Sequence, residues 1–255
     1  MSDLAALPDS TFAAVLAERA GALLLKLRDE SGLEGKELGK LGDHDSNELL
    51  LALLAEGRPG DAVLSEESKD TPERLSADRV WIIDPLDGTR EYGMPPRSDW
   101  AVHVALWERG ASGSAITAAA VAQPSLDEVY ATGATSTVTK HREKPIFLVS
   151  DSRPPAFAEA VAEALGGVLQ PMGSAGAKGM AVLRGDADAY LHAGGQWEWD
   201  SAAPVGVALA AGLHASRVDG STLTYNAEHP YLPDLIICRA DLAQPILTAI
   251  AAADG

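Results

Sequence analysis

The chain has 255 residues, enough for one large domain or two smaller ones that share a core. Its formal net charge of −17 argues against a surface that coats a nucleic-acid polymer, because a phosphate backbone requires clustered Lys and Arg. No apolar run has the length of a membrane span, and the single cysteine, Cys238, excludes an internal disulfide framework. We therefore expect a cytoplasmic protein whose partners include neither a nucleic-acid polymer nor a membrane.

Two helices are expected at the start of the chain. Apolar residues recur at helical spacing over residues 9–29, which predicts a first helix that serves packing. Residues 31–42 contain several Gly and Lys residues and predict a mobile connection. A second helix is expected to begin within residues 42–47, where Asp43 or Asp45 would cap free N–H groups.

A pair of acids follows the next predicted strand. Residues 58–61 read Arg-Pro-Gly-Asp and predict a turn, and residues 62–65 predict a short strand that ends at Glu66 and Glu67. Exposed glutamates are usually solvated charge. Two acids directly after an apolar strand nevertheless repel each other unless a cation lies beside them, so this pair is a candidate cation site.

Most of the functional argument rests on residues 80–89, which read Val-Trp-Ile-Ile-Asp-Pro-Leu-Asp-Gly-Thr. The first four predict a buried strand. Pro85 lacks an N–H and is expected to end this strand, leaving Asp84 at its carboxyl end. Asp87 follows three residues later, and Thr89 offers a hydroxyl and an N–H group to an anion.

Two carboxylates at this spacing suit divalent cations that hold a phosphate. Mg²⁺ prefers oxygen ligands and keeps several waters, so a few carboxylates and substrate oxygens suffice. A pair of such ions can activate water and stabilise a leaving oxygen. The alternative interpretation is that Asp84 and Pro85 form a turn and that Asp87 with Gly88 is a hairpin signal.

The rest of the first half predicts an antiparallel sheet. Residues 90–96 predict a turn-rich loop, and residues 100–107 a buried strand in which His103 is expected to be a satisfied core histidine. Further strands are expected over residues 115–123 and 128–131.

Strands and helices alternate in the second half, which predicts a second α/β layer. The threonine-rich residues 133–144 are the candidate boundary. After it we expect strands at 145–149, 168–171 and 188–191, and helices at 156–165, from the Gly-rich residues 173–178 through 183, and at 200–211.

Residues 195–199 are expected to form the loop that presents Asp200. Trp197 and Trp199 within it are able to clamp an aromatic base. Packing is the favoured interpretation for Trp199, and the role of Trp197 is left open.

Three motifs in this order resemble the inositol monophosphatase superfamily, a group of Mg²⁺-dependent, lithium-sensitive phosphomonoesterases. They are the Glu-Glu pair at 66–67, Asp-Pro-Leu-Asp-Gly-Thr at 84–89, and Trp-Asp before small residues at 199–203. The resemblance implies an α/β (α+β layered) fold, the α-β-α-β-α sandwich shared with fructose-1,6-bisphosphatase. It also implies subdomains over residues 1–138 and 139–255, and a homodimer.

The resemblance implies the site residues. Two or three Mg²⁺ ions would be held by carboxylates and one carbonyl, namely Glu66, Asp84, Leu86, Asp87 and Asp200. Asp43 and Thr89 would act on the attacking water, with Glu67 helping to orient waters. Amides of Gly88 and Thr89 would hold the phosphoryl oxygens. Li⁺ would inhibit by entering the weaker Mg²⁺ position.

The substrate class follows from finer resemblances. Inositol monophosphatases usually carry a glutamate where this chain has Ala193, whereas Asp-Gly-Thr-Arg-Glu-Tyr resembles the bisphosphate-nucleotidase (CysQ) branch. Substrate contacts are then expected at Ser150, Arg153, Gly173, Ser174, Lys178 and Asp200. The implied reaction converts 3′-phosphoadenosine 5′-phosphate to AMP and phosphate, with the 5′-phosphosulfate as second substrate, in sulfate assimilation. An inositol-1-phosphate or fructose-1,6-bisphosphate phosphatase is the nearest alternative, and a non-catalytic nucleotide or metal sensor is another.

Overall fold

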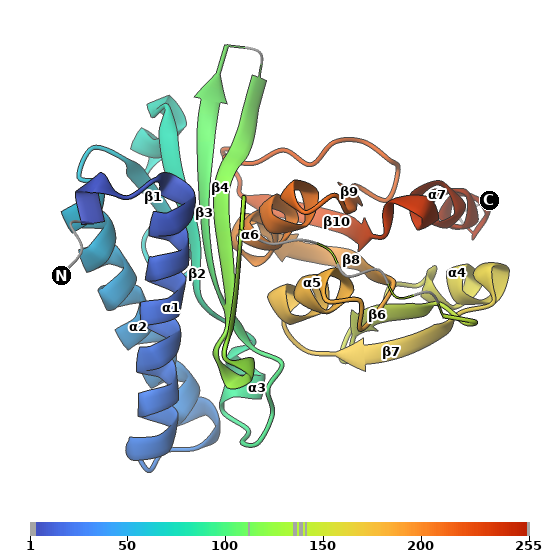
Figure 1. Ribbon diagram of the computed structural model, residues 1–255, viewed down its shortest axis with the longest axis horizontal. Helices are drawn as coiled ribbons and strands as arrows, with labels where there is room; N and C mark the ends of the chain where they lie inside the picture. Colours follow the sequence, from blue (N-terminus) through green and yellow to red (C-terminus); the bar gives the residue numbers. More distant parts are fainter. Residues whose placement is uncertain (1–3, 112, 135–136, 138–139, 141, 254–255) are drawn as a thin grey trace.

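The computed structural model describes residues 4–111, 113–134, 137, 140 and 142–253. Its helices are α1 (Asp9–Glu30), α2 (Gly35–Gly57), α3 (Thr89–Tyr92), α4 (Ala158–Leu165), α5 (Ala175–Leu183), α6 (Glu198–Ala210) and α7 (Ala243–Ala253). Its strands are β1 (Ala62–Ser65), β2 (Arg79–Asp87), β3 (Ala101–Gly110), β4 (Gly113–Gln123), β5 (Glu128–Ala131), β6 (Ile146–Ser150), β7 (Val168–Met172), β8 (Ala189–Trp197), β9 (His214–Ser216) and β10 (Tyr231–Cys238). Figure 1 shows these elements in five layers, which confirms the predicted α-β-α-β-α sandwich.

The first sheet has the strand order β1-β2-β3-β4-β5. It is mixed rather than purely antiparallel, because β1 pairs with β2 in parallel. The prediction that β2 ends at Asp84 was wrong. The strand continues to Asp87 across an irregularity, in which Asp84 lies opposite His103 and Asp87 lies opposite Ala101. One extra residue is accommodated there as a bulge, where a proline that lacks an N–H is tolerated.

Helices α1 and α2 cover one face of this sheet (Figure 1). The predicted connection at residues 31–42 was largely wrong, because α2 already begins at Gly35. Asp43 therefore lies within the helix and not at its cap. Two glycines explain the difference, since they let α2 pack close to the rest of the site. A Cβ atom at Gly39 would lie 2.7 Å from Cγ2 of Thr89, and one at Gly42 would lie 2.8 Å from the ring of Tyr92.

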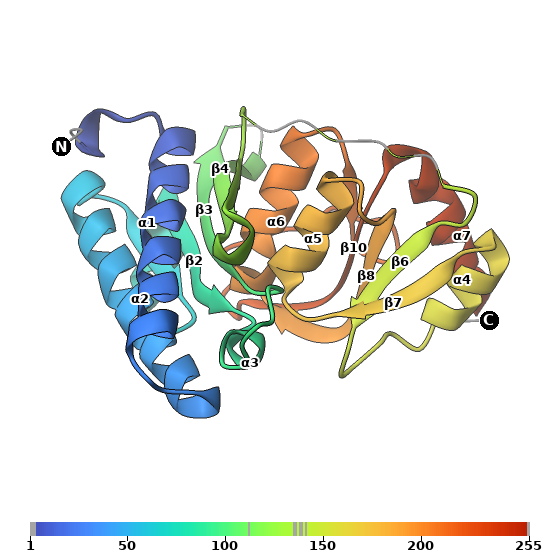
Figure 2. The ribbon, with the colours of Figure 1, turned by 60° about the horizontal axis from the view of Figure 1, so that its bottom comes forward.

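The second sheet has the strand order β7-β6-β8-β10-β9. Figures 1 and 2 both show α5 and α6 between the two sheets, and α4 with α7 on the outer face of the second. The predicted loop at residues 195–199 was wrong. Strand β8 runs on to Trp197, and α6 begins at the next residue, so Asp200 lies in the first turn of α6.

Three apolar cores separate the layers. The first packs α1 and α2 against the first sheet, and Phe12 meets Trp81 edge to face within it. The second joins the two sheets through α5 and α6, and the third lies under α4 and α7. The predicted boundary between residues 138 and 139 lies outside the described residues.

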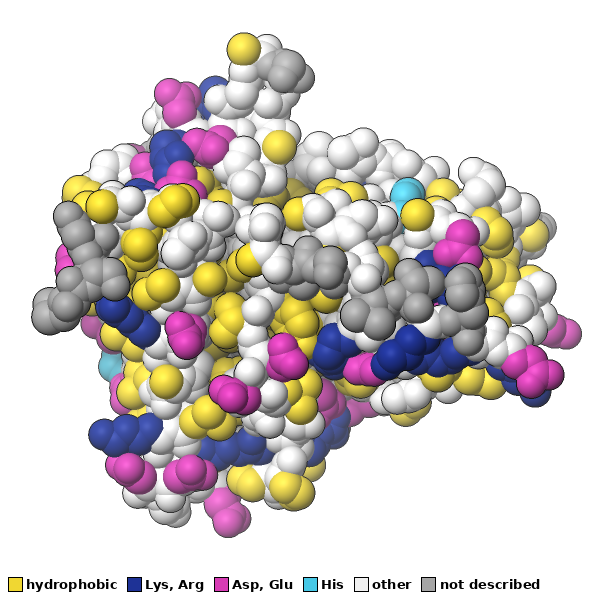
Figure 3. Space-filling view, viewed as in Figure 1, with side chains coloured by type: hydrophobic (Ala, Val, Ile, Leu, Met, Phe, Trp, Pro, Cys, Tyr) yellow, Lys and Arg dark blue, Asp and Glu magenta, His cyan; other side chains and the backbone are white. Residues whose placement is uncertain are grey.

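No helix among the described residues has the length and apolarity needed to cross a membrane. On the face shown in Figure 3, acidic and basic side chains are interspersed, without a broad basic patch.

Candidate functional site

Three carboxylates meet where the two sheets come together. Asp84 and Asp87 lie on the bulged end of β2, and Asp200 comes from the first turn of α6. One oxygen from each lies within 4.8 Å of the other two. Asp84 and Asp87 are buried and Asp200 is half-buried, so this grouping is costly without protons or a cation.

Backbone N–H groups orient two of the three acids. Oδ1 of Asp84 accepts a hydrogen bond from the Leu86 N–H at 3.0 Å, and Oδ2 of Asp200 accepts one from the Trp197 N–H at 2.7 Å. Among the described residues, the buried Oδ2 of Asp84 has no hydrogen-bond partner. A buried carboxylate oxygen without a donor is suited to a cation.

The third acid, Asp87, is held by the start of α5. Its Oδ2 accepts hydrogen bonds from the Ser174 hydroxyl at 2.5 Å and from the Gly176 N–H at 2.7 Å. Nε2 of the fully buried His103 lies 3.2 Å from the same oxygen, and Nδ1–H of this ring donates to the Trp199 carbonyl at 3.0 Å. His103 is therefore a core histidine, as expected, but one that contacts the acid cluster.

Mutual repulsion changes the acidity of the cluster. Burial, together with Glu66, Asp87 and Asp200, raises the pKa of Asp84 well above its usual range. Burial and Asp87 raise the pKa of Asp200 to about 6. Burial also acts to raise the pKa of Asp87, but His103 and the hydrogen bonds from Ser174 and Gly176 outweigh it, so that this pKa is lowered.

Glu66 and Glu67 follow β1 and lie beside this cluster rather than within it. Both residues are exposed. The Glu66 carboxylate nevertheless lies in a partly desolvated position near Asp200 and Asp87, and these effects raise its pKa to about 8. Oxygen donors whose pKa values are raised by crowding bind protons or hard divalent cations, so the set fits a Mg²⁺-type site.

Asp43 and Thr89, the two residues expected to act on the attacking water, are in contact. The Thr89 hydroxyl lies 3.1 Å from Oδ1 of Asp43 and 3.1 Å from the Leu86 carbonyl, either of which can accept its hydrogen. Desolvation and the charge of Glu67 raise the pKa of Asp43 to about 7. A threonine hydroxyl is thus joined to a carboxyl group that titrates near neutrality.

A cavity of about 490 Å³ opens beside the acids. Asp87 and Asp200 line it, together with every predicted substrate contact except Thr89, namely Gly88, Ser150, Arg153, Gly173, Ser174 and Lys178. Gly88 has φ of +86°, and a Cβ atom there would lie 3.1 Å from the Asp99 carbonyl and 3.2 Å from Cβ of Ser174. A side chain at position 88 would be strained and crowded, so glycine keeps this wall open.

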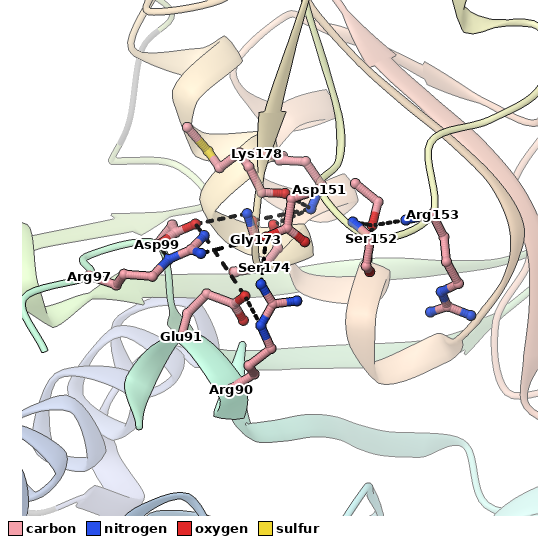
Figure 4. Close-up of polar contacts among 12 residues, drawn as sticks. Arg90, Glu91, Arg97, Asp99, Asp151, Ser152, Arg153, Gly173, Ser174 and Lys178 are labelled. Atoms are coloured by element: carbon pink, nitrogen blue, oxygen red, sulfur yellow. Dashed lines mark hydrogen bonds and ion pairs between the residues drawn. The ribbon is translucent and has the colours of Figure 1, made fainter. Parts of the chain in front are cut away.

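Lys178, expected from the sequence as a substrate contact, lines the cavity but is largely buried. Its side chain is only 4% exposed, and its ammonium donates to the carbonyls of Met172, Gly173 and Ser174 at 3.3, 3.2 and 2.7 Å. Burial lowers its pKa to about 8. It therefore fixes the loop that holds Asp87. Arg153 is exposed, and Figure 4 shows its guanidinium lying apart from the other labelled charges.

Sequence reasoning missed a charged network at the cavity mouth (Figure 4). Arg90 lies 3.0 Å from Asp151, and Arg97 binds Asp99 and lies 3.5 Å from Asp151. Asp99 in turn accepts a hydrogen bond from the Gly173 N–H at 2.8 Å. The network joins the two halves of the chain, and no local motif could have signalled it because residues in direct contact lie up to 74 positions apart.

Residues 8–252 match the profile of the Inositol monophosphatase family. The 3′-phosphoadenosine 5′-phosphate phosphatase of Mycobacterium leprae (strain TN) is 53% identical over 256 residues, which cover 96% of this chain and 94% of that protein. The protein of the same name from Mycobacterium tuberculosis (strain CDC 1551 / Oshkosh) is 56% identical over 240 residues, covering 91% of this chain and 89% of the relative. The crystal structure of CysQ from Bacteroides thetaiotaomicron matches with a TM-score of 0.77 at 25% identity, covering 89% of this chain and 96% of that one. The chain therefore belongs to the inositol monophosphatase family.

Proposed function

We propose that this chain is a metal-dependent phosphomonoesterase that hydrolyses 3′-phosphoadenosine 5′-phosphate to AMP and phosphate. The observation that carries the proposal is the position of Asp84, Asp87 and Asp200, whose oxygens lie within 4.8 Å of one another beside a cavity of about 490 Å³. That volume suits a small molecule. The names of the relatives at 53% and 56% identity support this substrate.

Mg²⁺ is the proposed cofactor, as two or three ions. Its ligands would be the carboxylates and the carbonyl predicted from the sequence, at Glu66, Asp84, Leu86, Asp87 and Asp200. The unpartnered Oδ2 of Asp84 and the raised pKa values of Glu66 and Asp200 support this set. When bound, Mg²⁺ would make water more acidic and neutralise charge on the phosphoryl and leaving oxygens.

The protein's own groups would align the nucleophile and the ester. The Thr89 hydroxyl, joined to Asp43, would orient the attacking water, and Asp43 would accept its proton. Glu67 would orient further waters. The N–H groups of Gly88 and Thr89 would bind the phosphoryl oxygens as their negative charge develops.

The second phosphate of the substrate would lie toward the second half of the chain. Ser150, Arg153, Gly173 and Ser174 line the cavity there, and Arg153 supplies an exposed cation. Lys178 would act beneath them by holding the carbonyls of the Gly173 loop. We extend the proposal to hydrolysis of the 5′-phosphosulfate analogue, a role in sulfate assimilation, a cytoplasmic location and a homodimer.

Phosphate release from a panel of esters tests the function. With Mg²⁺ present, kcat/KM is expected to be highest for 3′-phosphoadenosine 5′-phosphate, ahead of inositol 1-phosphate and fructose 1,6-bisphosphate. Chelation should abolish release, and millimolar Li⁺ should inhibit it. A preference for either sugar phosphate would favour the alternative function. Full turnover in the chelator would refute the metal-dependent reaction.

A further inference from the structure

An aromatic cluster borders the cavity at the end of β8. Trp197 and Tyr231 line the cavity with 39% and 44% of their surfaces exposed, and they lie directly opposite each other on β8 and β10. One side of the Trp197 ring stacks on Trp199, with centroids 5.4 Å apart and planes 15° apart. Tyr231 stands nearly perpendicular to it at 5.9 Å. Large aromatic rings that are both exposed and fixed in position usually bind a ligand or a partner.

Two glycines of β8 lie next to these rings. Gly194 and Gly195 precede Trp197, line the same cavity and have φ values of +95° and +92°. A Cβ atom at Gly195 would lie only 2.0 Å from the Tyr231 hydroxyl oxygen. Gly195 therefore lets Tyr231 pack directly against the backbone of β8, which holds this ring at the edge of the cavity, whereas a Cβ atom at Gly194 would meet nothing within 4 Å.

Two buried polar side chains line this end of the cavity without satisfying their hydrogen-bonding capacity. His192 is 7% exposed and Gln196 is 8% exposed, and within the described part of the chain neither Nε2 atom has a hydrogen-bond partner. Burial lowers the pKa of His192 to about 4, so the ring is neutral, and Nε2 is the nitrogen left without a partner. Buried polar atoms normally have a hydrogen-bond partner. A ligand that provides one to His192 or Gln196, after a small rotation of the side chain, would therefore be favoured.

The cluster is also attached to the acid site. The Trp197 N–H donates to Oδ2 of Asp200 at 2.7 Å. The Tyr190 ring lies 4.9 Å from the Lys178 ammonium and 6.2 Å from the His192 ring. A ligand whose ester lies at the carboxylates can therefore extend along β8 to the aromatic rings. The main chain of Trp197 serves the acids, whereas its side chain faces the cavity, so the two roles can be separated by mutation.

We propose that Trp197, Tyr231, His192 and Gln196 form a nucleobase subsite, which makes this phosphatase selective for nucleotides over sugar phosphates. This inference rests on the proposed function. A purine offers a π-face to Trp197 and an edge with donors and acceptors to His192 and Gln196. Inositol and fructose phosphates have neither, so they would leave the rings uncovered and the two polar side chains unpaired.

The test compares two substrates that share both phosphates and the sugar: 3′-phosphoadenosine 5′-phosphate and 1-deoxyribose 3,5-bisphosphate, which has no base. For the wild type, kcat/KM should be about tenfold or more higher for the nucleotide, as loss of base stacking implies. W197A should remove most of this ratio, chiefly through KM. W197F keeps an aromatic ring and should restore much of it.

V168A is the matched control, because Val168 is an exposed apolar residue on β7, outside the cavity lining. It should keep the wild-type ratio. Equal kcat/KM for both bisphosphates in the wild type would overturn the subsite alone, as would an equal loss on both in W197A. The wild-type comparison stands even if a variant fails to fold. An enzyme that hydrolyses inositol 1-phosphate and neither bisphosphate would overturn the subsite and the proposed function together.

Discussion

Nε2 of His103 lies 3.2 Å from Oδ2 of Asp87, so a ring on β3 supports an acid on the neighbouring strand from inside the core. The other nitrogen of this ring donates to the Trp199 carbonyl, one residue before Asp200. One imidazole therefore fixes the spacing between two acids that come from strand β2 and helix α6. Side chains that orient metal ligands in this way set metal affinity as well as structure.

Replacing this ring should weaken both stability and the Mg²⁺ site. H103A leaves a buried cavity and removes the contact to Asp87, so we expect a loss of about 2–4 kcal/mol in the free energy of unfolding. The Mg²⁺ concentration for half-maximal activity should rise about 10–100-fold. Urea denaturation and Mg²⁺ titration of activity measure the two effects. H214A, which changes a half-buried histidine on β9, is the control and should leave the Mg²⁺ titration unchanged.

Gly176 should tolerate no side chain. A Cβ atom there would lie 2.1 Å from Nε2 of His103, so G176A must push the ring or the start of α5 away from Asp87. We expect about 1–3 kcal/mol of destabilisation together with a clear loss of kcat/KM. G179A, one turn later, is the matched control, because its Cβ atom would come no closer than 3.2 Å to Pro204. Equal behaviour of the two variants would contradict the close packing of α5 on His103.

Asp84 should lower the stability of the metal-free protein while being required for catalysis. D84N removes a buried acid whose ionisation is disfavoured by burial and by Glu66, Asp87 and Asp200, so the metal-free protein should melt at a higher temperature. Because about 1 kcal/mol shifts the Tm of a chain of this size by about 2–4 °C, the change is measurable by calorimetry in a chelator. Turnover should fall by about 100-fold or more, as expected when a main electrostatic contact is lost. Full turnover in D84N would exclude an essential role for this acid in catalysis. Because a non-catalytic sensor has no turnover, the same result would also contradict that alternative.

The stability of the metal-free protein should fall as pH rises. The pKa values of Glu66, Asp43 and Asp200 are raised to about 8, 7 and 6, against about 4 in an unfolded chain. Between pH 4 and pH 8 the folded state therefore holds protons that the unfolded state has lost, and the free energy of unfolding decreases with pH. Mg²⁺ should cancel this decrease by replacing the protons. Thermal melts from pH 5 to pH 8, with Mg²⁺ or with a chelator, measure this decrease in stability. A stability that rises with pH in the chelator would contradict the raised pKa values of the clustered acids.

Two neighbouring aspartates on α2 should differ sharply. Asp43 contacts the Thr89 hydroxyl, whereas Asp45, two residues later on the same helix, has no assigned role in the site. D43N keeps the shape but cannot accept a proton, so kcat should fall by about 100-fold, within the usual contribution of a general base. D45N should retain wild-type kcat. Steady-state kinetics at saturating substrate separates them, and similar kcat values would remove Asp43 from the proposed proton path.

Local patterns were enough to predict most of the first sheet, whereas the grouping of the acids was predicted from the resemblance to a known family. The apolar run at 80–83 and the acids after it are short-range features, whereas Asp200 lies more than 100 residues away and was linked to them only by that resemblance. In the structure one oxygen of each of Asp84, Asp87 and Asp200 lies within 4.8 Å of the other two. The start of α2 was misread because glycine normally disfavours helix, whereas Gly39 and Gly42 are required here for close packing against Thr89 and Tyr92.

Contacts between residues far apart in the chain could not be predicted from the sequence. The residues from His214 onward received no assigned element, yet they form β9, β10 and α7. The position of His103 against Asp87 depends on strand register, and the burial of Lys178 depends on three carbonyls of a loop that folds back on it. A lysine reads as surface charge in a sequence because its burial requires such partners, which only the folded chain supplies.

The strand order of the second sheet has a consequence for how the protein is made on the ribosome. In the first sheet, neighbouring strands are also consecutive in the chain, so each can pair soon after it is synthesised. In the second sheet, β10 lies between β8 and β9, and residues 231–238 must therefore emerge before that sheet can close. Until then the edge of β8 lacks its neighbouring strand. We expect a stage of synthesis in which the first half of the chain is ordered while the second half still exposes an unpaired strand. That strand is available to chaperones and prone to aggregation.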